Sequence, residues 1–169
     1  RGVSLQSMTK VLRHTLCNGV YRDYDMVNAH PVIALQYLQK KNMSVPYLKE
    51  YVENRDKCIK DLMEPNDLSR NETKQLILSV FNGGNNGYNA LQNKTDWILG
   101  FYKESIRIRD ALYNDPEHEH LLKEVKKLKK GNVPAQKRSL ANKLWVDIEN
   151  TILEWCIKWC HSIGLSTEY

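Results

Sequence analysis

The chain has 169 residues, of which 41% are hydrophobic and 27% are charged, as is ordinary for a globular protein. The net charge of +5 fits a polyanionic partner, but it is far below the charge of a dedicated basic tail. We find no signal peptide and no apolar run near the roughly 20 residues that span a bilayer, so we expect an intracellular protein (cytoplasm or nucleus) without a membrane partner.

The first third of the chain is expected to hold three helices and one strand. The hydrophobic pattern predicts helices over residues 5–16, 29–41 and 44–65 and a strand over residues 20–27. Asn28 follows the strand as the N-cap of the second helix, and Pro31 lies in the first turn of that helix.

The rest of the chain is expected to be helical. Ser69 and Glu72 form a capping box that opens a helix ending at Gly83. Residues 83–89 are a loop by composition, and residues 131–136 are a linker. Further helices are expected over residues 95–113, 117–130 and 138–163. Aromatic residues recur at helical steps and are expected in the core: Trp97, Phe101, Trp145, Trp155 and Trp159.

These elements predict an α+β fold in which helix predominates. One strand cannot form a stable sheet, so partner strands either hide in the predicted loops or lie beyond the ends of the chain. The chain opens on Arg1 and stops just after a long helix. We therefore expect a piece of a larger protein.

Two carboxylates lie close together on the predicted strand. Asp23 and Asp25 are two residues apart, so their side chains share one face of the strand and repel each other unless a cation lies beside them. A divalent metal is one such cation, and an arginine or lysine from a facing helix is another. A strand that ends in carboxylates and turns into a capped helix is a suitable place for a metal-bound phosphate.

The segment from Asp25 to Pro31 resembles palm motif A of family B DNA polymerases, which is an aspartate, two residues, then Ser-Leu-Tyr-Pro. The resemblance implies that Asp25 binds the catalytic metal, Mg²⁺ or Mn²⁺, and that Asp23 assists it. Asn28 matches the serine of the motif. His30 matches the tyrosine that lies under the incoming sugar, which implies that both residues contact the substrate.

A second resemblance begins at Arg70. Arg70, Lys74, Leu78 and Asn82-Gly83 follow the fingers-helix pattern of family A polymerases, in which residues four apart share one helical face. The resemblance implies that Arg70 and Lys74 hold the triphosphate of an incoming nucleotide. Read without the resemblance, the same positions fit an ordinary solvated basic face.

The two motifs occur in the order found in polymerases, and the chain resembles divergent DNA polymerases of large DNA viruses and mobile elements. The resemblance implies a partial palm over residues 1–45, helical fingers over 46–130, and a linker and returning helix over 131–169. The implied partners are a template-primer, nucleoside triphosphates and the remainder of a parent polymerase, and the implied location includes a viral replication site. A second catalytic aspartate usually follows the fingers in a hairpin, but Asp96, Asp110 and Asp147 lie in helical patterns. We therefore expect this piece alone to be inactive.

The densest positive segment holds Lys126, Lys127, Lys129 and Lys130. These lysines fit contacts to a nucleic-acid backbone, which depend on charge more than on shape, and they equally fit a solvated helix surface. The same lysines are also compatible with a different class of function. In that alternative the chain is a non-catalytic helical module that binds nucleic acid or a protein, and its aspartates form ordinary salt bridges.

Overall fold

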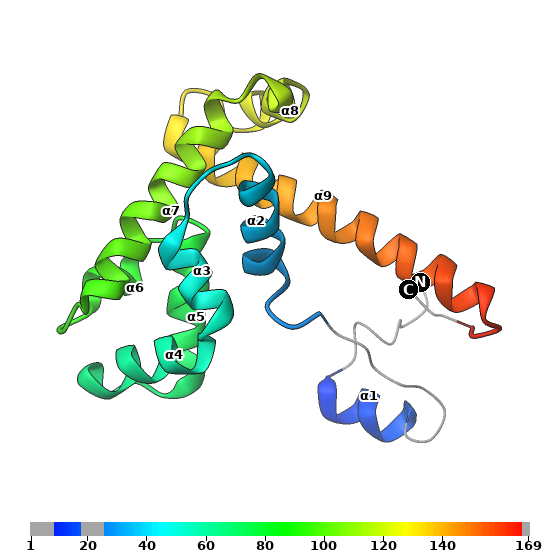
Figure 1. Ribbon diagram of the computed structural model, residues 1–169, viewed down its shortest axis with the longest axis horizontal. Coiled ribbons are helices and arrows are strands. Elements are labelled where there is room, and N and C mark those ends of the chain that lie inside the picture. Colours follow the sequence, from blue (N-terminus) through cyan, green and yellow to red (C-terminus); the bar gives the residue numbers. More distant parts are fainter. Residues whose placement is uncertain (1–8, 18–25, 167–169) are drawn as a thin grey trace.

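The computed structural model describes residues 9–17 and 26–166, and Figure 1 shows these residues as a set of helices. No strand occurs within these two ranges, so the predicted α+β class with a partial palm is wrong for the described chain, which is all-helical. The predicted strand over residues 20–27 falls largely outside the described residues. Its described end, residues 26–27, runs into a turn that opens the next helix. The error arose because β-branched and aromatic residues favour a strand only where a neighbouring strand can pair with them.

The first two helices agree with the expected positions. Helix α1 (Lys10–Cys17) covers the second half of the helix predicted over residues 5–16, and it lies apart from α2–α8 in Figure 1. Helix α2 (Ala29–Lys40) confirms the second predicted helix. Its inner face is buried and consists of Pro31, Ile33, Ala34, Leu35 and Leu38.

The predicted helix over residues 44–65 is divided in the structure. Helix α3 (Pro46–Glu53) and helix α4 (Arg55–Met63) meet at Asn54, whose φ of −126° and ψ of 40° are not helical. A short 3₁₀ turn, η2 (Glu64–Asn66), follows α4. The break at Asn54 turns the chain and places the charged start of α4 next to the start of α2.

Helix α5 (Arg70–Phe81) opens with the predicted capping box. The backbone N–H of Glu72 donates to the Ser69 hydroxyl oxygen at 3.2 Å, and the Ser69 N–H donates to the Glu72 carboxylate at 2.9 Å. The helix ends before Gly83, which adopts a φ of +90°. The loop predicted after it is partly wrong, because residues 86–90 form the short helix α6 (Asn86–Ala90).

The remaining helices are α7 (Asp96–Asn114), α8 (Glu119–Leu128) and α9 (Val133–Ser162), with a 3₁₀ turn, η3 (Pro116–His118), before α8. The linker predicted over residues 131–136 is wrong for the most part. The side-chain oxygen of Asn132 accepts the backbone N–H of Ala135 at 3.0 Å, and this cap starts α9 five residues earlier than the hydrophobic pattern indicated.

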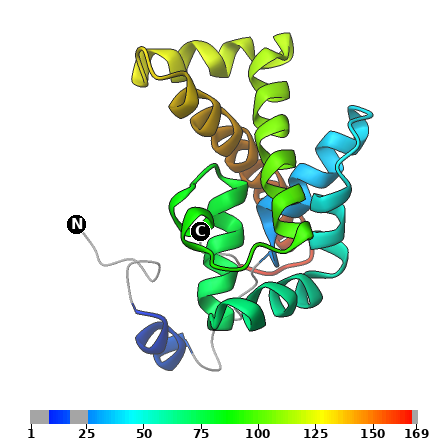
Figure 2. The ribbon, with the colours of Figure 1, turned by 90° about the vertical axis from the view of Figure 1, so that its left-hand side faces the viewer.

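Helix α9 organises the core. Its N-terminal half packs against α2, α7 and α8, and Figure 2 shows it crossing obliquely behind α7. The side chains of Trp145 and Phe101 are each 1% exposed, and Trp97 packs against this core, as predicted for all three. The buried residues of α2–α5, α7, α8 and α9 form one hydrophobic cluster.

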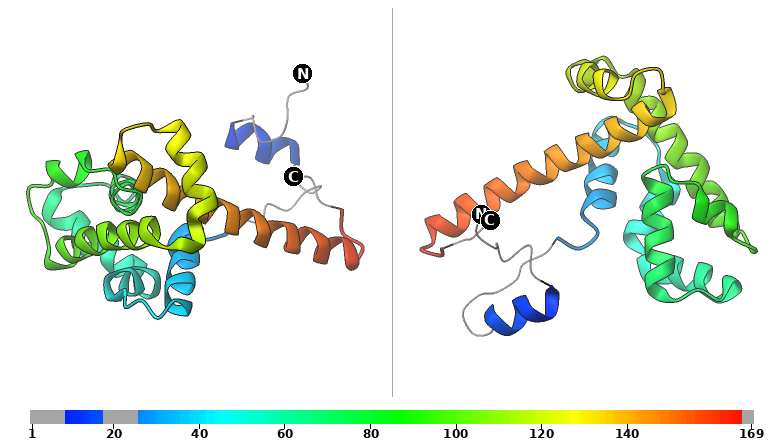
Figure 3. Two further views of the ribbon diagram at one scale, coloured as in Figure 1. Left: turned by 90° about the horizontal axis from the view of Figure 1, so that it is seen from above. Right: turned by 180° about the vertical axis from the view of Figure 1, so that it is seen from behind.

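The C-terminal half of α9 projects beyond the other helices, as both views in Figure 3 show. Trp155 and Trp159 lie on this half and are 66% and 62% exposed, so their predicted place in the core is wrong for the described chain. Helical spacing identifies an apolar stripe but does not show what covers it. Among the described helices, none combines the length and the apolar character needed to cross a membrane.

Candidate functional site

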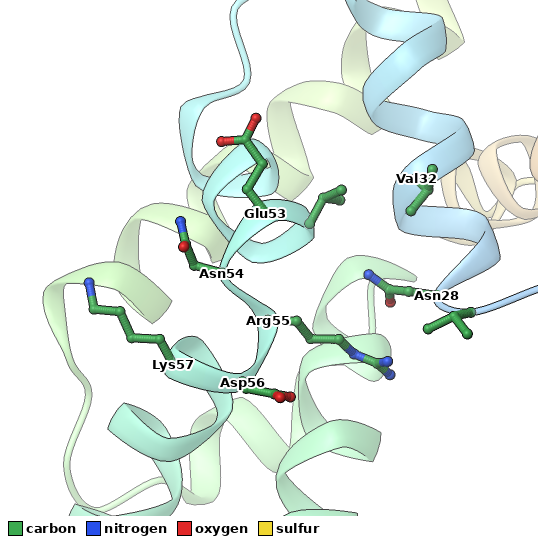
Figure 4. A pocket seen from close by; sticks show the side chains of 9 residues that line it. Asn28, Val32, Glu53, Asn54, Arg55, Asp56 and Lys57 are labelled. Carbon is green, nitrogen blue, oxygen red and sulfur yellow. The ribbon is translucent and has the colours of Figure 1, made fainter.

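A pocket of about 530 Å³ lies where the start of α2 faces the junction of α3 and α4 (Figure 4). Residues 27–28 and Val32 line it from the α2 side, and residues 52–57 line it from the other side. The break at Asn54 forms this pocket, because it directs the first turn of α4 toward α2. Four of the six residues from α3 and α4 carry a charge, which makes the pocket a polar one.

Asn28 is one wall of the pocket. It occupies the predicted N-cap position of α2, but with a φ of 58° and a ψ of 37° it is left-handed, and its side chain makes no capping hydrogen bond. Its backbone carbonyl accepts the N–H of Val32 at 3.2 Å. Its side-chain oxygen is buried and makes no hydrogen bond within the described part of the chain. The first amides of α2 therefore lack the cap that an asparagine at this position usually provides.

Arg55 is the opposite wall. Its side chain extends from the first residue of α4 toward Asn28 (Figure 4). Its Nε atom is buried and makes no hydrogen bond to any described residue. The guanidinium also affects buried Tyr51: burial raises the pKa of that phenol, and the positive charge of Arg55 opposes the rise.

Arg70, one of the two predicted phosphate ligands, reaches the edge of the pocket through Asp56. The Arg70 guanidinium donates to the Asp56 carboxylate at 2.6 Å, and this contact lowers the pKa of Asp56. Both side chains are exposed. Lys74 lies one turn further along α5, on the same side of the helix as Arg70, and is partly buried.

His30, the predicted sugar contact, is held by the last helix. Its Nε2 atom lies 3.0 Å from a carboxylate oxygen of Glu149 on α9, and both side chains are about one quarter exposed. The start of α2 is thus fixed against α9 close to the pocket. Sequence spacing gave no reason to pair these residues, because 119 positions separate them.

The predicted metal ligand Asp25 and the assisting Asp23 lie outside the described residues. Within the described ranges, no three histidine, cysteine, aspartate or glutamate side chains come together in a way that could hold a metal ion. The described residues therefore supply no metal site of their own, and the assignment of Mg²⁺ or Mn²⁺ to Asp25 stays a prediction.

The predicted nucleic-acid contacts lie elsewhere. The four lysines at the end of α8 and in the turn to α9 are exposed: Lys126, Lys127, Lys129 and Lys130. They lie at the C-terminal end of α8, whereas the contact of 3.1 Å between Lys41 and Asp115 joins the segment before the other end of α8 to the C-terminal end of α2. The pocket adjoins the N-terminal end of α2 and none of its lining residues belongs to α8, which lies at the opposite end of α2 in Figure 1.

Two residues of the pocket were not recognised from the sequence. Arg55 and Asp56 belong to the run Glu53-Asn54-Arg55-Asp56-Lys57, which has the composition of a solvated helical surface. The only local signal was Asn54, a residue type that often interrupts helices.

The chain is similar to a protein of a virophage. The chain is 35% identical over 114 residues to "Putative helicase V13" of Sputnik virophage, an alignment that covers 64% of this chain and 15% of that protein. The chain therefore matches a small part of the length of this relative. No protein-family model matches the chain, and no solved structure matches it.

Proposed function

We propose that the chain is the helical, nucleotide-holding part of a template-dependent nucleic-acid polymerase within a viral replication protein. One observation carries the proposal: the turn that follows position 25 lines a pocket, and Arg70 at the start of α5 binds a carboxylate at the edge of that pocket. Asn28 lines that pocket, and Asp56, which also lines it, binds Arg70. A virophage relative named as a helicase supports the proposal, because helicases and polymerases both act on nucleic acid during replication.

In this proposal, Arg70 and Lys74 bind the triphosphate of the incoming nucleotide. Arg70 offers a planar fork for phosphate oxygens, and Lys74 a compact point charge. The ion pair between Arg70 and Asp56 is exposed on both sides, so opening it costs little and a phosphate is able to replace the carboxylate. Asp25, assisted by Asp23, would hold Mg²⁺ or Mn²⁺, which when bound neutralises charge on the phosphates.

His30 would lie under the sugar of the nucleotide. The carboxylate of Glu149 accepts a hydrogen bond from the Nε2–H of its ring and thereby fixes the orientation of the imidazole. Glu149 is thus a positioning residue in this proposal.

The proposal is tested by nucleotide binding to the whole chain. A fluorescent deoxynucleoside triphosphate should bind in the presence of Mg²⁺ or Mn²⁺, and Asp25→Ala and Lys74→Ala should each weaken binding by at least about tenfold, the usual order for losing one charge-assisted contact. Asp61→Ala on α4 and Lys103→Ala on α7 remove exposed charges of the same kind and serve as controls. Unchanged affinity in Asp25→Ala would refute the proposal.

A second candidate function rests on the lysines at the turn between α8 and α9. Among the described residues, no carboxylate lies within ion-pair distance of Lys127, Lys129 or Lys130. A helical module that binds nucleic-acid backbones through these lysines would bind single-stranded DNA with a strong salt dependence. Replacing the three lysines by alanine should then reduce the salt slope without changing nucleotide affinity.

A further inference from the structure

The apolar stripe of α9 continues past the core onto the projecting half of the helix. Ile148, Ile152, Trp155 and Trp159 recur at steps of three or four residues, so they share one face of α9. The two isoleucines pack against the core, whereas the two tryptophans are exposed. The tryptophans therefore extend a face that α9 already uses for packing, and an exposed apolar patch of this kind marks a site of interaction.

Helix α1 has an exposed apolar face of its own. Leu12 and Leu16 are four residues apart and lie on one side of the helix, with Val11 beside them. Their side chains are 49%, 58% and 78% exposed, in that order. An isolated helix of this length is marginal in water, because most helical stability comes from packing of the apolar face. Helix α1 therefore needs a surface to pack on.

Helix α2 shows how the N-terminal part of the chain runs relative to α9. The ring of Tyr37 meets the ring of Trp145 edge-on, with 5.8 Å between the centroids. His30, two turns earlier in α2, contacts Glu149, one turn later in α9. The two helices are therefore antiparallel, and the start of α2 points toward the projecting half of α9. Helix α1 lies at that end of the molecule in Figure 1 and in both views of Figure 3.

The chain is long enough for α1 to reach the exposed tryptophans. Eleven residues, 18–28, separate α1 from α2, and eleven extended residues span about 36 Å. The start of α2 is fixed at Glu149 through His30. The helix from Glu149 to Ser162 is only about 20 Å long. Both tryptophans therefore lie within reach of α1.

The two segments carry opposite net charge. Helix α1 contains Lys10 and Arg13 and no carboxylate. Beyond Trp145, which is the last buried residue of α9, the helix has one lysine, Lys158, and three carboxylates. These carboxylates are Asp147, Glu149 and Glu154. The long-range field thus draws α1 toward the projecting half, most strongly at low salt.

We propose that α1 packs its apolar face against Trp155 and Trp159 of the same chain. Leucine side chains and indole rings then cover each other from water, and the encounter is intramolecular, so it needs no high protein concentration. With α1 packed in this way, the segment that carries Asp23 and Asp25 is held at both ends, because α2 holds its other end. The contact does not depend on the proposed function, since it requires neither nucleotide nor metal.

Tryptophan fluorescence of the whole chain tests this contact. Trp155→Phe/Trp159→Phe leaves only the two core tryptophans, so subtracting its signal from that of the wild type gives the emission of the exposed pair. This emission should be shielded from acrylamide, an uncharged quencher. Leu12→Asp should increase the quenching and shift the emission to longer wavelength, because burial of a charged side chain is unfavourable. Leu16→Asp should act in the same way.

The matched control is Leu128→Asp, which makes the same substitution at an exposed leucine of α8 and should leave the emission of Trp155 and Trp159 unchanged. All three leucines are exposed, so the core should stay folded in each variant, as circular dichroism would verify. Equal quenching in the wild type and in Leu12→Asp would overturn the proposal. Shielding that disappears when the wild type is diluted would also overturn it, because a second copy of the chain, and not α1, would then cover the tryptophans.

Discussion

The guanidinium of Arg109 donates a hydrogen bond of 2.8 Å to the backbone carbonyl of Phe81, and so joins the middle of α7 to the last turn of α5. The last carbonyls of a helix have no partner within the helix, and here a buried side chain supplies one. Burial lowers the pKa of Arg109, yet an arginine remains charged in a folded protein. The helix that carries Arg70 and Lys74 is thereby anchored at its far end.

Arg109→Met should destabilise the fold by about 2–4 kcal/mol, because it keeps much of the side-chain volume but leaves the Phe81 carbonyl buried without a partner. Urea unfolding followed by circular dichroism measures the change. Lys103→Met, on the same helix but exposed, should stay within about 0.5 kcal/mol of the wild type. Equal unfolding midpoints for the two variants would contradict the assigned role of Arg109.

Two glycines near the end of α5 should respond to alanine in opposite directions. Gly83 has a φ of +90°, and an added Cβ would lie 2.5 Å from Cγ of Arg138, so Gly83→Ala should cost about 1–2 kcal/mol or more. Gly87 lies within helix α6 and has ordinary contact distances, so Gly87→Ala should stabilise the protein by about 0.4–1 kcal/mol. Thermal unfolding of both variants provides the measurement, and a loss of stability in Gly87→Ala would contradict a helical backbone at position 87.

The capping box at the start of α5 is expected to set the stability of the segment that holds Arg70. Ser69→Ala removes the acceptor for the Glu72 N–H and should cost about 1 kcal/mol. Ser69→Asp retains an acceptor and should lose little. Hydrogen exchange at the first amides of α5 should become faster in the alanine variant, and unaltered exchange there would argue against the cap.

Acid should weaken the protein through His118. This histidine is buried and lies 2.9 Å from the Tyr37 hydroxyl, and burial lowers its pKa from the ordinary value of 6.5. The unfolded chain therefore takes up the proton first, so the free energy of unfolding should fall as the pH decreases below 6.5, until His118 itself becomes protonated. Urea unfolding at pH 7.5 and pH 5.5 measures this loss, and His118→Gln should lack it. A variant with the same pH dependence as the wild type would assign the effect to other groups.

Local chemistry was sufficient to locate most helices from the sequence. The capping box at Ser69, the threonine that caps α7 and the glycine after α5 act through neighbours in the chain, so their effects can be read directly from the sequence. The predicted α+β class was wrong because a strand forms only where another strand from elsewhere in the chain pairs with it, which local sequence does not show. Asn54 interrupts a segment that is otherwise compatible with a continuous helix, and a single asparagine is too weak a signal to predict such a break.

The site was predictable only in part, for the same reason. The resemblance singled out Asn28 and Arg70, which the structure places at the pocket and at its edge. Arg55 was missed because its environment depends on α2, which approaches it in space from 27 positions earlier in the chain. Whether Asp25 and Lys74 converge on one nucleotide stays a prediction, since position 25 lies outside the described residues.

The projecting half of α9 has a practical consequence for spectroscopy. The four tryptophans divide into two sets, with Trp97 and Trp145 packed in the core and Trp155 and Trp159 facing water. When α1 is not packed against them, the second set should emit at longer wavelength and be open to collisional quenchers such as iodide. The helix therefore carries a native fluorescent reporter. A molecule that binds to its projecting half should shift the tryptophan emission to shorter wavelength and protect these two residues from quenching.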